Sequence, residues 1–401
     1  MIKQIYRREV NPTGSISSDL WPAAFDLSHA SWAASVETLQ IDLVASGWIN
    51  LFTAMLMPPP EVELRWAGVG PGTNAEIKRA YSALMGRFFG RATLRFDHGC
   101  RWLRQVVDGL ELAPGVHLRR RPGHLGDLPD WVGWDDFNDC WVVAEAKGSH
   151  DQGDWLTVNP PPIKTALKQL ARVQIVDASG PIAFKTWAVA CRWGTEANLL
   201  PPVIITCDPD DDGRQLEEWE VSKVREESRA RWVADLLDGL GRPDIAAAVR
   251  SSDLDGASAT EDDLVAIPTR SGYAALAIEA GGLIPLIGLD RGERAAALLE
   301  TARILKRGTA LVMLDRSAVE SAIMRTGPDD RLDANLRRAW WADGYAPAPV
   351  PPDLVEGVAG PVRTRAVPPA DVPKPTDLTV DGLTFRTEVD DIGFLEVGTS
   401  A

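Results

Sequence analysis

The sequence predicts an α/β protein, and two observations support this prediction. The first is an apolar run of strand-forming residues, Trp141 to Lys147, which contains no glycine or proline and turns polar only in its last three positions. Such a run is typical of a strand that is covered on both faces. The second is the order of patterns along the chain, in which helices alternate with strands on both sides of this run.

Local signals delimit each element. The first helix follows a glycine-rich loop and begins with Thr73-x-x-Glu76, a capping box that satisfies free amides at the helix start. The second helix begins at three consecutive prolines, residues 160–162, which suit a first helical turn. The predicted elements, in order, are a helix over residues 73–88, one or two strands over 102–112 and another over 116–121, a hairpin over 130–134 and 141–147, a helix over 160–173, and strands over 186–191 and 203–207.

Composition limits the class of protein. The chain has 401 residues, of which 45% are hydrophobic and 25% charged, so it is long enough for two domains. Its four cysteines are widely spaced and form no CxxC pair, which favours neither a zinc site nor a disulfide framework and fits a reducing cytoplasm. The most apolar window, residues 43–57, is too short to span a membrane. We therefore expect a cytoplasmic protein without a membrane partner.

The two halves of the chain differ in charge. Residues 1–200 contain 20 Lys and Arg against 21 Asp and Glu, whereas residues 201–401 contain 22 against 36. The acidic half is suited to a protein partner or a homo-oligomer rather than to a broad DNA-binding surface. The acidic run 208–213 begins like a calcium loop, but Trp219 stands where such a loop needs a glutamate, so we interpret the run as a linker.

These features predict four segments. Within the acidic segment we expect helices over 215–250 and 291–307 and strands over 265–268, 283–288 and 309–315, and Asp381-Gly382 predicts a terminal hairpin over 378–385. The segments are an N-terminal extension (1–60), an α/β domain containing the central hairpin (61–207), a second, acidic α/β domain for a partner or for oligomerisation (208–343), and a Pro-rich linker with the terminal hairpin (344–401).

Charged residues at the end of the apolar run form the candidate site. Because side chains alternate along a strand, Glu145 and Lys147 project from one face and Ala146 from the other. The turn-forming residues 135–139 let the preceding segment pair back, which brings Asp130 near Glu145. Two converging carboxylates raise each other's pKa unless a cation lies between them, and Mg²⁺ prefers such oxygen ligands together with substrate phosphate. A neighbouring lysine can orient a water molecule or stabilise charge on a phosphate, so the pattern indicates phosphodiester hydrolysis.

Pro129-Asp130, followed by Glu145-Ala146-Lys147, resembles the signature of the PD-(D/E)xK nuclease superfamily, which includes restriction endonucleases and many repair and defence nucleases. The resemblance covers about residues 74–207 and implies a restriction-endonuclease-like αβββαβ core with a mixed sheet, in agreement with the order of elements above. It implies that Asp130, Glu145 and the backbone carbonyl of Ala146 bind Mg²⁺, for which Mn²⁺ can substitute, and that Lys147 positions the attacking water. A surface hairpin with a cross-strand ion pair is the alternative interpretation.

The resemblance also implies supporting residues near the metal. Gln169 and Lys168 lie on the helix after the Glu-x-Lys strand, and Glu76 lies on the first helix. A solvated helix face is the alternative for at least two of the four polar residues of that helix, which are Lys164, Lys168, Gln169 and Arg172. A role in the cap alone is the alternative for Glu76. Arg119, Arg120 and Arg121, just before the motif, are candidates for phosphate contacts, with a solvated basic cluster as the alternative.

The expected function is therefore that of a Mg²⁺-dependent endonuclease, a hydrolase that acts on nucleic acid and on DNA in preference to RNA. By family analogy, its role is antiviral or other defence against foreign DNA, or restriction-like cleavage. A hypothesis from another class is a non-catalytic, nuclease-like scaffold that binds protein or nucleic acid as part of a complex. The presence of all three motif residues, Asp130, Glu145 and Lys147, argues against this second hypothesis.

Overall fold

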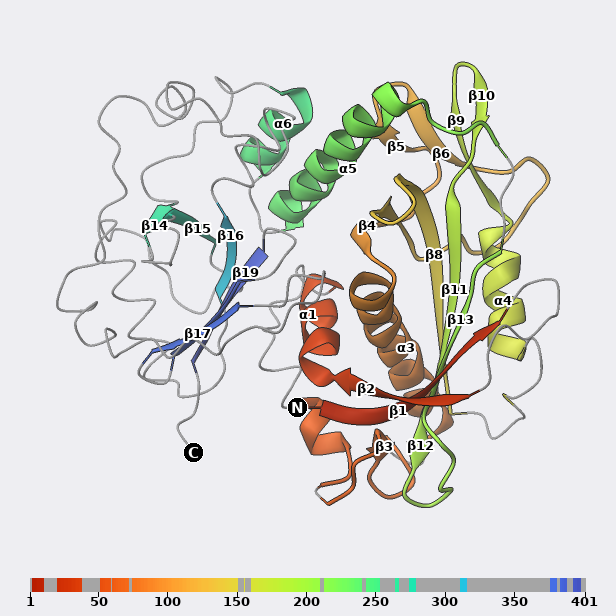
Figure 1. Ribbon diagram of the computed structural model, residues 1–401, viewed down its shortest axis with the longest axis vertical. Helices are drawn as coiled ribbons and strands as arrows, with labels where there is room; N and C mark the ends of the chain where they lie inside the picture. Colours follow the sequence, from red (N-terminus) through yellow and green to blue (C-terminus); the bar gives the residue numbers. More distant parts are fainter. Residues whose placement is uncertain are drawn as a thin grey trace. The chain divides into compact units, whose positions relative to one another are not determined.

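Figure 1 shows the computed structural model of the chain. The chain divides into two compact units, one made of Met1–Glu37 and Trp48–Ser228 and the other of Thr38–Gly47 and Arg229–Ala401. The structure describes residues 2–10, 20–37, 51–58, 60–71, 74–150, 155, 160–209, 213–239 and 243–252, and the strand residues 264–266, 274–278, 311–315, 376–380, 383–387 and 392–397.

A seven-stranded mixed sheet forms the centre of the first unit. β8 (Cys140–Ser149) is parallel to β11 (Lys185–Arg192), and β1 (Ile2–Val10) is parallel to β13 (Val203–Cys207). All other neighbouring strands of the sheet are antiparallel. The strands predicted at residues 186–191 and 203–207 are confirmed as β11 and β13. The strand order is β2 (Trp21–Asp26), β1 (Ile2–Val10), β13 (Val203–Cys207), β11 (Lys185–Arg192), β8 (Cys140–Ser149), β7 (Trp131–Asp135) and β4 (Cys100–Gln105).

β7 and β8 form the predicted central hairpin. The carboxylate of Asp135 holds its turn, because it accepts hydrogen bonds from the backbone N–H groups of Phe137 (2.8 Å) and Asn138 (3.0 Å). All residues of β8 from Trp141 to Ala146 are buried. The unbroken apolar run therefore corresponds to a strand covered on both faces, as predicted.

Helices cover the two faces of this sheet (Figure 1). α3 (Ala75–Asp97) packs on one face together with α1 (Leu27–Glu37), and α4 (Pro161–Leu170) packs on the other. Both α3 and α4 contact β8 and β11. Glycines allow α3 to approach β8 closely, since a Cβ atom on Gly90 of α3 would lie 2.7 Å from the Cβ of Ala146.

The cap of α3 differs from the prediction. Asn74, not Thr73, is the N-cap, and its side-chain oxygen accepts hydrogen bonds from the N–H groups of Glu76 (2.7 Å) and Ile77 (3.3 Å). Asparagine is among the most effective N-cap residues, so a helix starting one residue later is equally well capped. The capping box assigned to Thr73 and Glu76 is thus replaced by a cap from Asn74.

Two smaller sheets accompany the large one. The strand-like residues 102–112 belong to two different sheets, because Asp108 and Gly109 form a turn between β4 and β5. The second predicted helix also ends earlier than expected, at Leu170, and Val173 begins β9. The four-stranded sheet has the order β10 (Gly180–Ile182), β9 (Val173–Asp177), β6 (Val116–Arg120) and β5 (Leu110–Ala113), and the two-stranded sheet consists of β12 (Gly194–Thr195) and β3 (Arg65–Trp66).

The N-terminal residues are part of the large sheet. Residues 1–60 are predicted to be an N-terminal extension, but β1 and β2 pair with each other and β1 pairs with β13. All five residues of β13 are buried, and such a strand is poorly suited to the edge of a sheet. β1 and β2 therefore complete the sheet beyond β13.

The described residues beyond 212 form two helices and a six-stranded sheet. α5 (Glu218–Gly239) and α6 (Pro243–Ser251) confirm the helices predicted over 215–250, and the division between the two units falls within α5. β17 (Thr376–Val380) and β18 (Leu383–Thr387) form the predicted terminal hairpin, which joins a sheet of its own chain. The predicted helix 291–307, strand 283–288 and Pro-rich residues 345–375 lie outside the described residues. The sheet has the order β14 (Leu264–Ala266), β15 (Ala274–Ile278), β16 (Leu311–Asp315), β19 (Ile392–Val397), β18 (Leu383–Thr387) and β17 (Thr376–Val380).

All four cysteines are free, and Cys100, Cys191 and Cys207 are buried. Burial raises the pKa of each of these three thiols, which keeps them protonated at neutral pH. Among the described residues, no helix is long and apolar enough to cross a membrane.

His98, which follows α3, is expected to make stability depend on pH. Its ring packs against Trp187 with 4.0 Å between ring centroids, and burial, aided by the charges of Arg7 and Lys185, lowers its pKa from 6.5 to about 4. The unfolded chain therefore binds a proton between pH 6.5 and 4 that the folded chain does not bind, so stability present above pH 6.5 is lost as the pH falls through this window. We expect a loss of at most about 3 kcal/mol from this group.

Urea unfolding midpoints measured between pH 4 and 8 test this expectation. The variant His98→Gln should show a flatter pH profile than the native chain. Identical profiles for the two proteins would mean that His98 is not the responsible group.

Candidate active site

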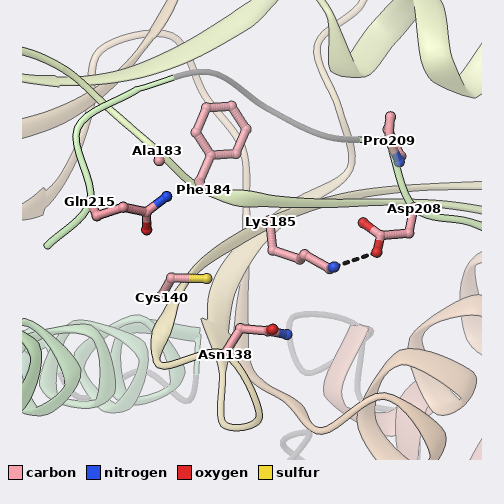
Figure 2. A pocket seen from close by; sticks show the side chains of 8 residues that line it. All are labelled: Asn138, Cys140, Ala183, Phe184, Lys185, Asp208, Pro209 and Gln215. Carbon is pink, nitrogen blue, oxygen red and sulfur yellow. Dashed lines mark ion pairs between the residues drawn. The ribbon is translucent and has the colours of Figure 1, made fainter.

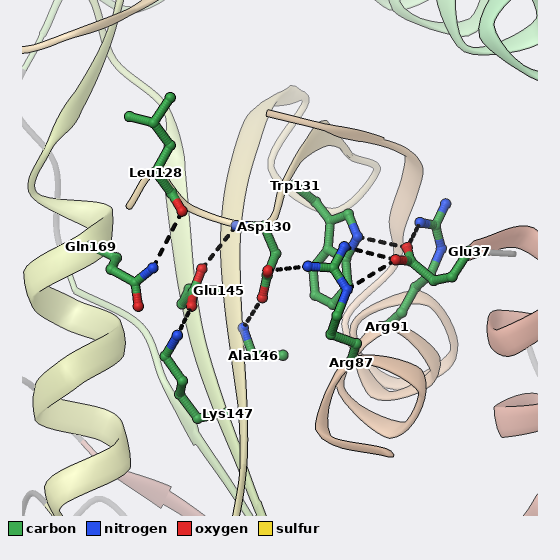
Figure 3. A network of polar contacts seen from close by, with 10 residues as sticks. All are labelled: Glu37, Arg87, Arg91, Leu128, Asp130, Trp131, Glu145, Ala146, Lys147 and Gln169. Carbon is green, nitrogen blue, oxygen red and sulfur yellow. Dashed lines mark hydrogen bonds and ion pairs between the residues drawn. The ribbon is translucent and has the colours of Figure 1, made fainter. Parts of the chain in front are cut away.

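Asp130 and Glu145 meet where the central hairpin opens. The pairing of β7 with β8 ends at Trp131 and Ala144, so Asp130 and the residues after Ala144 lie beyond the last pair. The backbone N–H of Asp130 donates a hydrogen bond to Oε2 of Glu145 (2.8 Å), and the N–H of Ala146 donates to Oδ2 of Asp130 (2.9 Å). The convergence of Asp130 and Glu145 predicted from the sequence is therefore present (Figure 3).

Lys147 lies beside Glu145 on the same face of β8, as alternation predicts. Its ammonium group forms an ion pair with Oε1 of Glu145. The Lys147 side chain is 28% exposed, whereas that of Glu145 is only 1% exposed. The pair thus has a buried acidic end and a basic end that solvent reaches.

The two carboxyl groups are held in an environment that disfavours their charge. Burial first, and the neighbouring charge of Asp130 second, raise the pKa of Glu145 to about 7, although Lys147 opposes the shift. Burial also raises the pKa of Asp130 above its ordinary value, against the opposing charge of Arg87. Pairs of carboxyl groups with raised pKa values are frequent at functional sites.

A second group of charged residues, which the sequence analysis did not identify, is joined to Asp130. Arg87 of α3 forms ion pairs with both Asp130 and Glu37, the last residue of α1. Glu37 also pairs with Arg91 and accepts a hydrogen bond from Nε1 of Trp131 (2.7 Å). Burial alone would raise the pKa of Glu37, but the charges of Arg91 and Arg87 together lower it below its ordinary value.

Gln169 supports the backbone that leads to Asp130. It lies on α4, is 6% exposed, and its side-chain amide donates a hydrogen bond to the carbonyl oxygen of Leu128 (3.3 Å). This hydrogen bond is with the segment before Asp130 rather than with a carboxyl oxygen. Figure 3 shows Gln169 on the opposite side of Glu145 from Arg87. Gln169 is positioned to fix the chain at Leu128.

The other sequence candidates lie away from this cluster. Glu76 is exposed in the first turn of α3, eleven residues before Arg87, which corresponds to roughly 16 Å along a helix. It is therefore not among the residues that the structure brings to Asp130. Lys168 is exposed on α4, one residue before Gln169.

The three consecutive arginines do not form one basic surface. Arg119 is exposed at the end of β6, whereas Arg120 donates a hydrogen bond to the carbonyl of Gly126 (2.7 Å) and Arg121 donates one to the carbonyl of Val173 (2.7 Å). These two arginines hold the loop that leads to Asp130. Of the three, Arg119 is the best placed for a phosphate.

For the nuclease that the sequence predicts, Gln169→Ala should reduce cleavage about tenfold, because loss of an outer partner of a metal site commonly has an effect of 10- to 100-fold. Glu76→Ala is expected to change cleavage less than about twofold, since surface substitutions away from a site have small effects. Rates of plasmid cleavage by both variants and by the native chain test the two expectations. An equal loss in both variants would place Glu76 in the site after all.

The donor groups at the open end of the hairpin fit Mg²⁺ in type. Asp130 and Glu145 offer carboxylate oxygens, and Ala146 offers its carbonyl, which points to the same side of the strand as the N–H group that binds Asp130. A cation between the two carboxylates would also relieve the unfavourable charge of Glu145. No cluster of three or more His, Cys, Asp or Glu suited to a metal occurs in the part of the chain that the structure describes. A cation here would rely on two carboxylates, a carbonyl and water or phosphate, a ligand set that Mg²⁺ accepts.

A separate cleft of about 240 Å³ lies at the other end of β8 (Figure 2). Lys185 and Asp208 form an ion pair in its wall. Cys140 in this wall lies five residues before Glu145, roughly 17 Å along a strand, so the cleft does not belong to the acidic cluster. It is lined by Asn138, Cys140, Ala183, Phe184, Lys185, Asp208, Pro209 and Gln215.

Comparison of the chain with models of known families, with curated proteins and with solved structures finds no match.

Proposed function

We propose that this chain is a metal-dependent nuclease that hydrolyses phosphodiester bonds. The observation that carries the proposal is the convergence of Asp130, Glu145 and Lys147 at the open end of one hairpin. The order α3, β4, β7, β8, α4, β11, with β8 and β11 parallel, agrees with the αβββαβ core that the resemblance to PD-(D/E)xK nucleases implies. β5, β6, β9 and β10 are insertions into that order.

The residues divide the chemistry between them. Asp130, Glu145 and the carbonyl of Ala146 would hold the metal ion, which when bound supplies Lewis-acid activation of the phosphate and lowers the pKa of water. Lys147 orients the attacking water and stabilises the negative charge that develops at phosphorus, since its ammonium group is the part of the pair open to solvent. Gln169 keeps Asp130 in place through Leu128.

DNA is the proposed substrate, in preference to RNA. Two exposed cations, Arg119 on β6 and Lys168 on α4, are available for sequence-independent contacts with the phosphate backbone. The resemblance implies an in-line displacement that leaves a 5′-phosphate. Defence against foreign DNA is the role that this activity would serve.

The test is incubation of the purified full chain with supercoiled plasmid, linear duplex, single-stranded DNA and RNA, each with Mg²⁺, Mn²⁺ or EDTA. The expected result is metal-dependent cutting that Glu145→Ala lacks. Cutting that persists in EDTA, or in Glu145→Ala, would contradict the proposal.

One observation favours the second candidate, a non-catalytic nuclease-like scaffold. The carboxylates of Asp130 and Glu145 already have basic partners, Arg87 and Lys147, so their charges are balanced without a metal ion. For such a scaffold, Mg²⁺ and Mn²⁺ would leave the thermal unfolding temperature unchanged. For the nuclease, Mn²⁺ should raise the unfolding temperature of the native chain and not that of Glu145→Ala.

A further inference from the structure

Arg87 is held in a fixed position above the candidate site. Its Nε and Nη2 atoms donate hydrogen bonds to Oε2 of Glu37 (3.1 and 2.7 Å), and its guanidinium carbon lies 4.9 Å from the ring centroid of Trp131. Glu37 is itself fixed by Arg91, whose Nη2 also donates to the carbonyl of Leu103 (2.7 Å). Glu37, Arg91 and Trp131 thus form a platform that orients the Arg87 guanidinium (Figure 3).

Part of this guanidinium remains available to a ligand. A guanidinium has five N–H groups, and three of those of Arg87 are used, two by Glu37 and one by Asp130. The remaining two, one on each terminal nitrogen, have no partner among the described residues. The Arg87 side chain is 29% exposed, so an incoming group can reach it.

The charges of the cluster show what kind of group is needed. Without a metal ion the network of Figure 3 is balanced, because it contains three acidic and three basic side chains: Glu37, Asp130 and Glu145 with Arg87, Arg91 and Lys147. A divalent cation on Asp130 and Glu145 would add two positive charges close to Arg87. An anion that enters with the cation offsets part of this added charge, since a phosphodiester carries one negative charge for each phosphate.

We propose that Arg87 binds the phosphate that is cleaved. In the substrate-free chain its guanidinium pairs with Asp130; when substrate and metal enter, it binds a phosphoryl oxygen through its two unpaired N–H groups, while Glu37 keeps it in orientation. This inference rests on the proposed nuclease function and adds Arg87 as a catalytic residue, with Glu37 as a positioning residue.

Three variants test the inference. Arg87→Ala removes the guanidinium, and Arg87→Lys keeps the charge without the fork of N–H groups. Arg79→Ala is the matched control, because Arg79 is exposed on the same helix, two turns earlier, and loses the same charge. Each full-length variant is examined in three ways at pH 8: Mn²⁺ binding by titration calorimetry, binding of a short DNA duplex in Ca²⁺ at several salt concentrations, and cleavage of the duplex in Mg²⁺.

For Arg87→Ala we expect cleavage to fall about 100-fold or more, as for loss of one donor to a developing oxyanion. The slope of log K for duplex binding against log salt should become smaller by about 0.9, the value for one lost phosphate contact. Mn²⁺ affinity should be unchanged or increase up to about tenfold, since a competing cation is removed from Asp130. Arg87→Lys should recover part of the salt slope and little of the cleavage, and Arg79→Ala should cleave like the native chain.

A structural role for Arg87 gives a different pattern. If Arg87→Ala loses Mn²⁺ binding and cleavage together with an unchanged salt slope, or cleaves like the native chain, the inference is overturned while the nuclease function stands. If the native chain cuts nothing but Arg87→Ala still reduces the salt slope, the phosphate contact stands and the nuclease function fails. If the native chain neither binds the duplex nor cuts it, both are overturned.

Discussion

Replacement of Lys147 by alanine is expected to reduce DNA cleavage at least about 1000-fold, a loss of roughly 4 kcal/mol in transition-state stabilisation. Lys147 presents the only solvent-reachable end of its pair with Glu145, so its ammonium group is the part of the pair that can meet water and phosphate. Folding should survive the change. The pKa of Glu145 is already about 7, so this buried carboxyl can take up a proton when it loses its partner rather than remain an unpaired buried charge.

Metal binding distinguishes the Lys147→Ala variant from substitutions of the two carboxylates, Asp130 and Glu145. Lys147→Ala and Lys147→Met should retain the rise in unfolding temperature that Mn²⁺ produces, because the oxygen ligands are intact. Asp130→Ala and Glu145→Ala should lose both the rise and the cleavage. Lys223→Ala, at an exposed position on α5, serves as the control for loss of a lysine charge. Full activity in Lys147→Ala would contradict the mechanism.

The hairpin and its acidic end were predictable because they depend on local pattern. The apolar run of β8, the turn-forming residues after Asp135 and the alternation of Glu145 and Lys147 are all visible within twenty residues of sequence. Strand pairing then follows from the turn, and the approach of Asp130 to Glu145 follows from the pairing. Short-range periodicity was therefore sufficient to predict the approach of Asp130, Glu145 and Lys147 to one another.

The partner network of Asp130 depends on tertiary structure instead. Glu37 lies 93 residues before Asp130 in the sequence, and no pattern near it indicates a site. A signal did exist on α3, where Arg87, Arg91 and Arg95 are spaced by four residues among apolar neighbours and therefore share one face of the helix. Because Arg91 and Arg95 are buried, that face requires acidic or carbonyl partners from elsewhere in the chain.

Glu76 shows the limit of transferring a role from a resemblance. The first helix of the core begins close to its predicted start, but it ends at Asp97 rather than near residue 88. A role beside the metal depends on the position of a residue along that helix, which the sequence pattern does not determine. α3 has 23 residues and crosses β8 near Gly86, far from its first turn. The acidic residue joined to Asp130 through Arg87 comes from α1 instead.

The close crossing of α3 over β8 predicts that position 148 has no room for a side chain. Gly148→Ala is expected to lower the free energy of unfolding by about 3 kcal/mol or more, as overpacking against a rigid backbone does. A Cβ atom on Gly148 would overlap the carbonyl oxygen of Ser82 on α3 and lie 3.0 Å from the Cα of Gly86. The φ angle of Gly148 is not in the left-handed region, so alanine could adopt the same backbone and the loss would arise from packing alone.

Gly86→Ala tests the same contact from the helix. In an open helical position, glycine to alanine stabilises by about 1 kcal/mol, so a loss of stability at Gly86 would report the crowding against Gly148. Ala83→Gly, at an exposed position one turn earlier, is the control and should lose only about 1 kcal/mol. Urea unfolding followed by tryptophan fluorescence measures all three. Native-like stability of Gly148→Ala would mean that α3 and β8 are further apart. Because Gly86 and Arg87 are adjacent on the helix, α3 would then not bring Arg87 to Asp130.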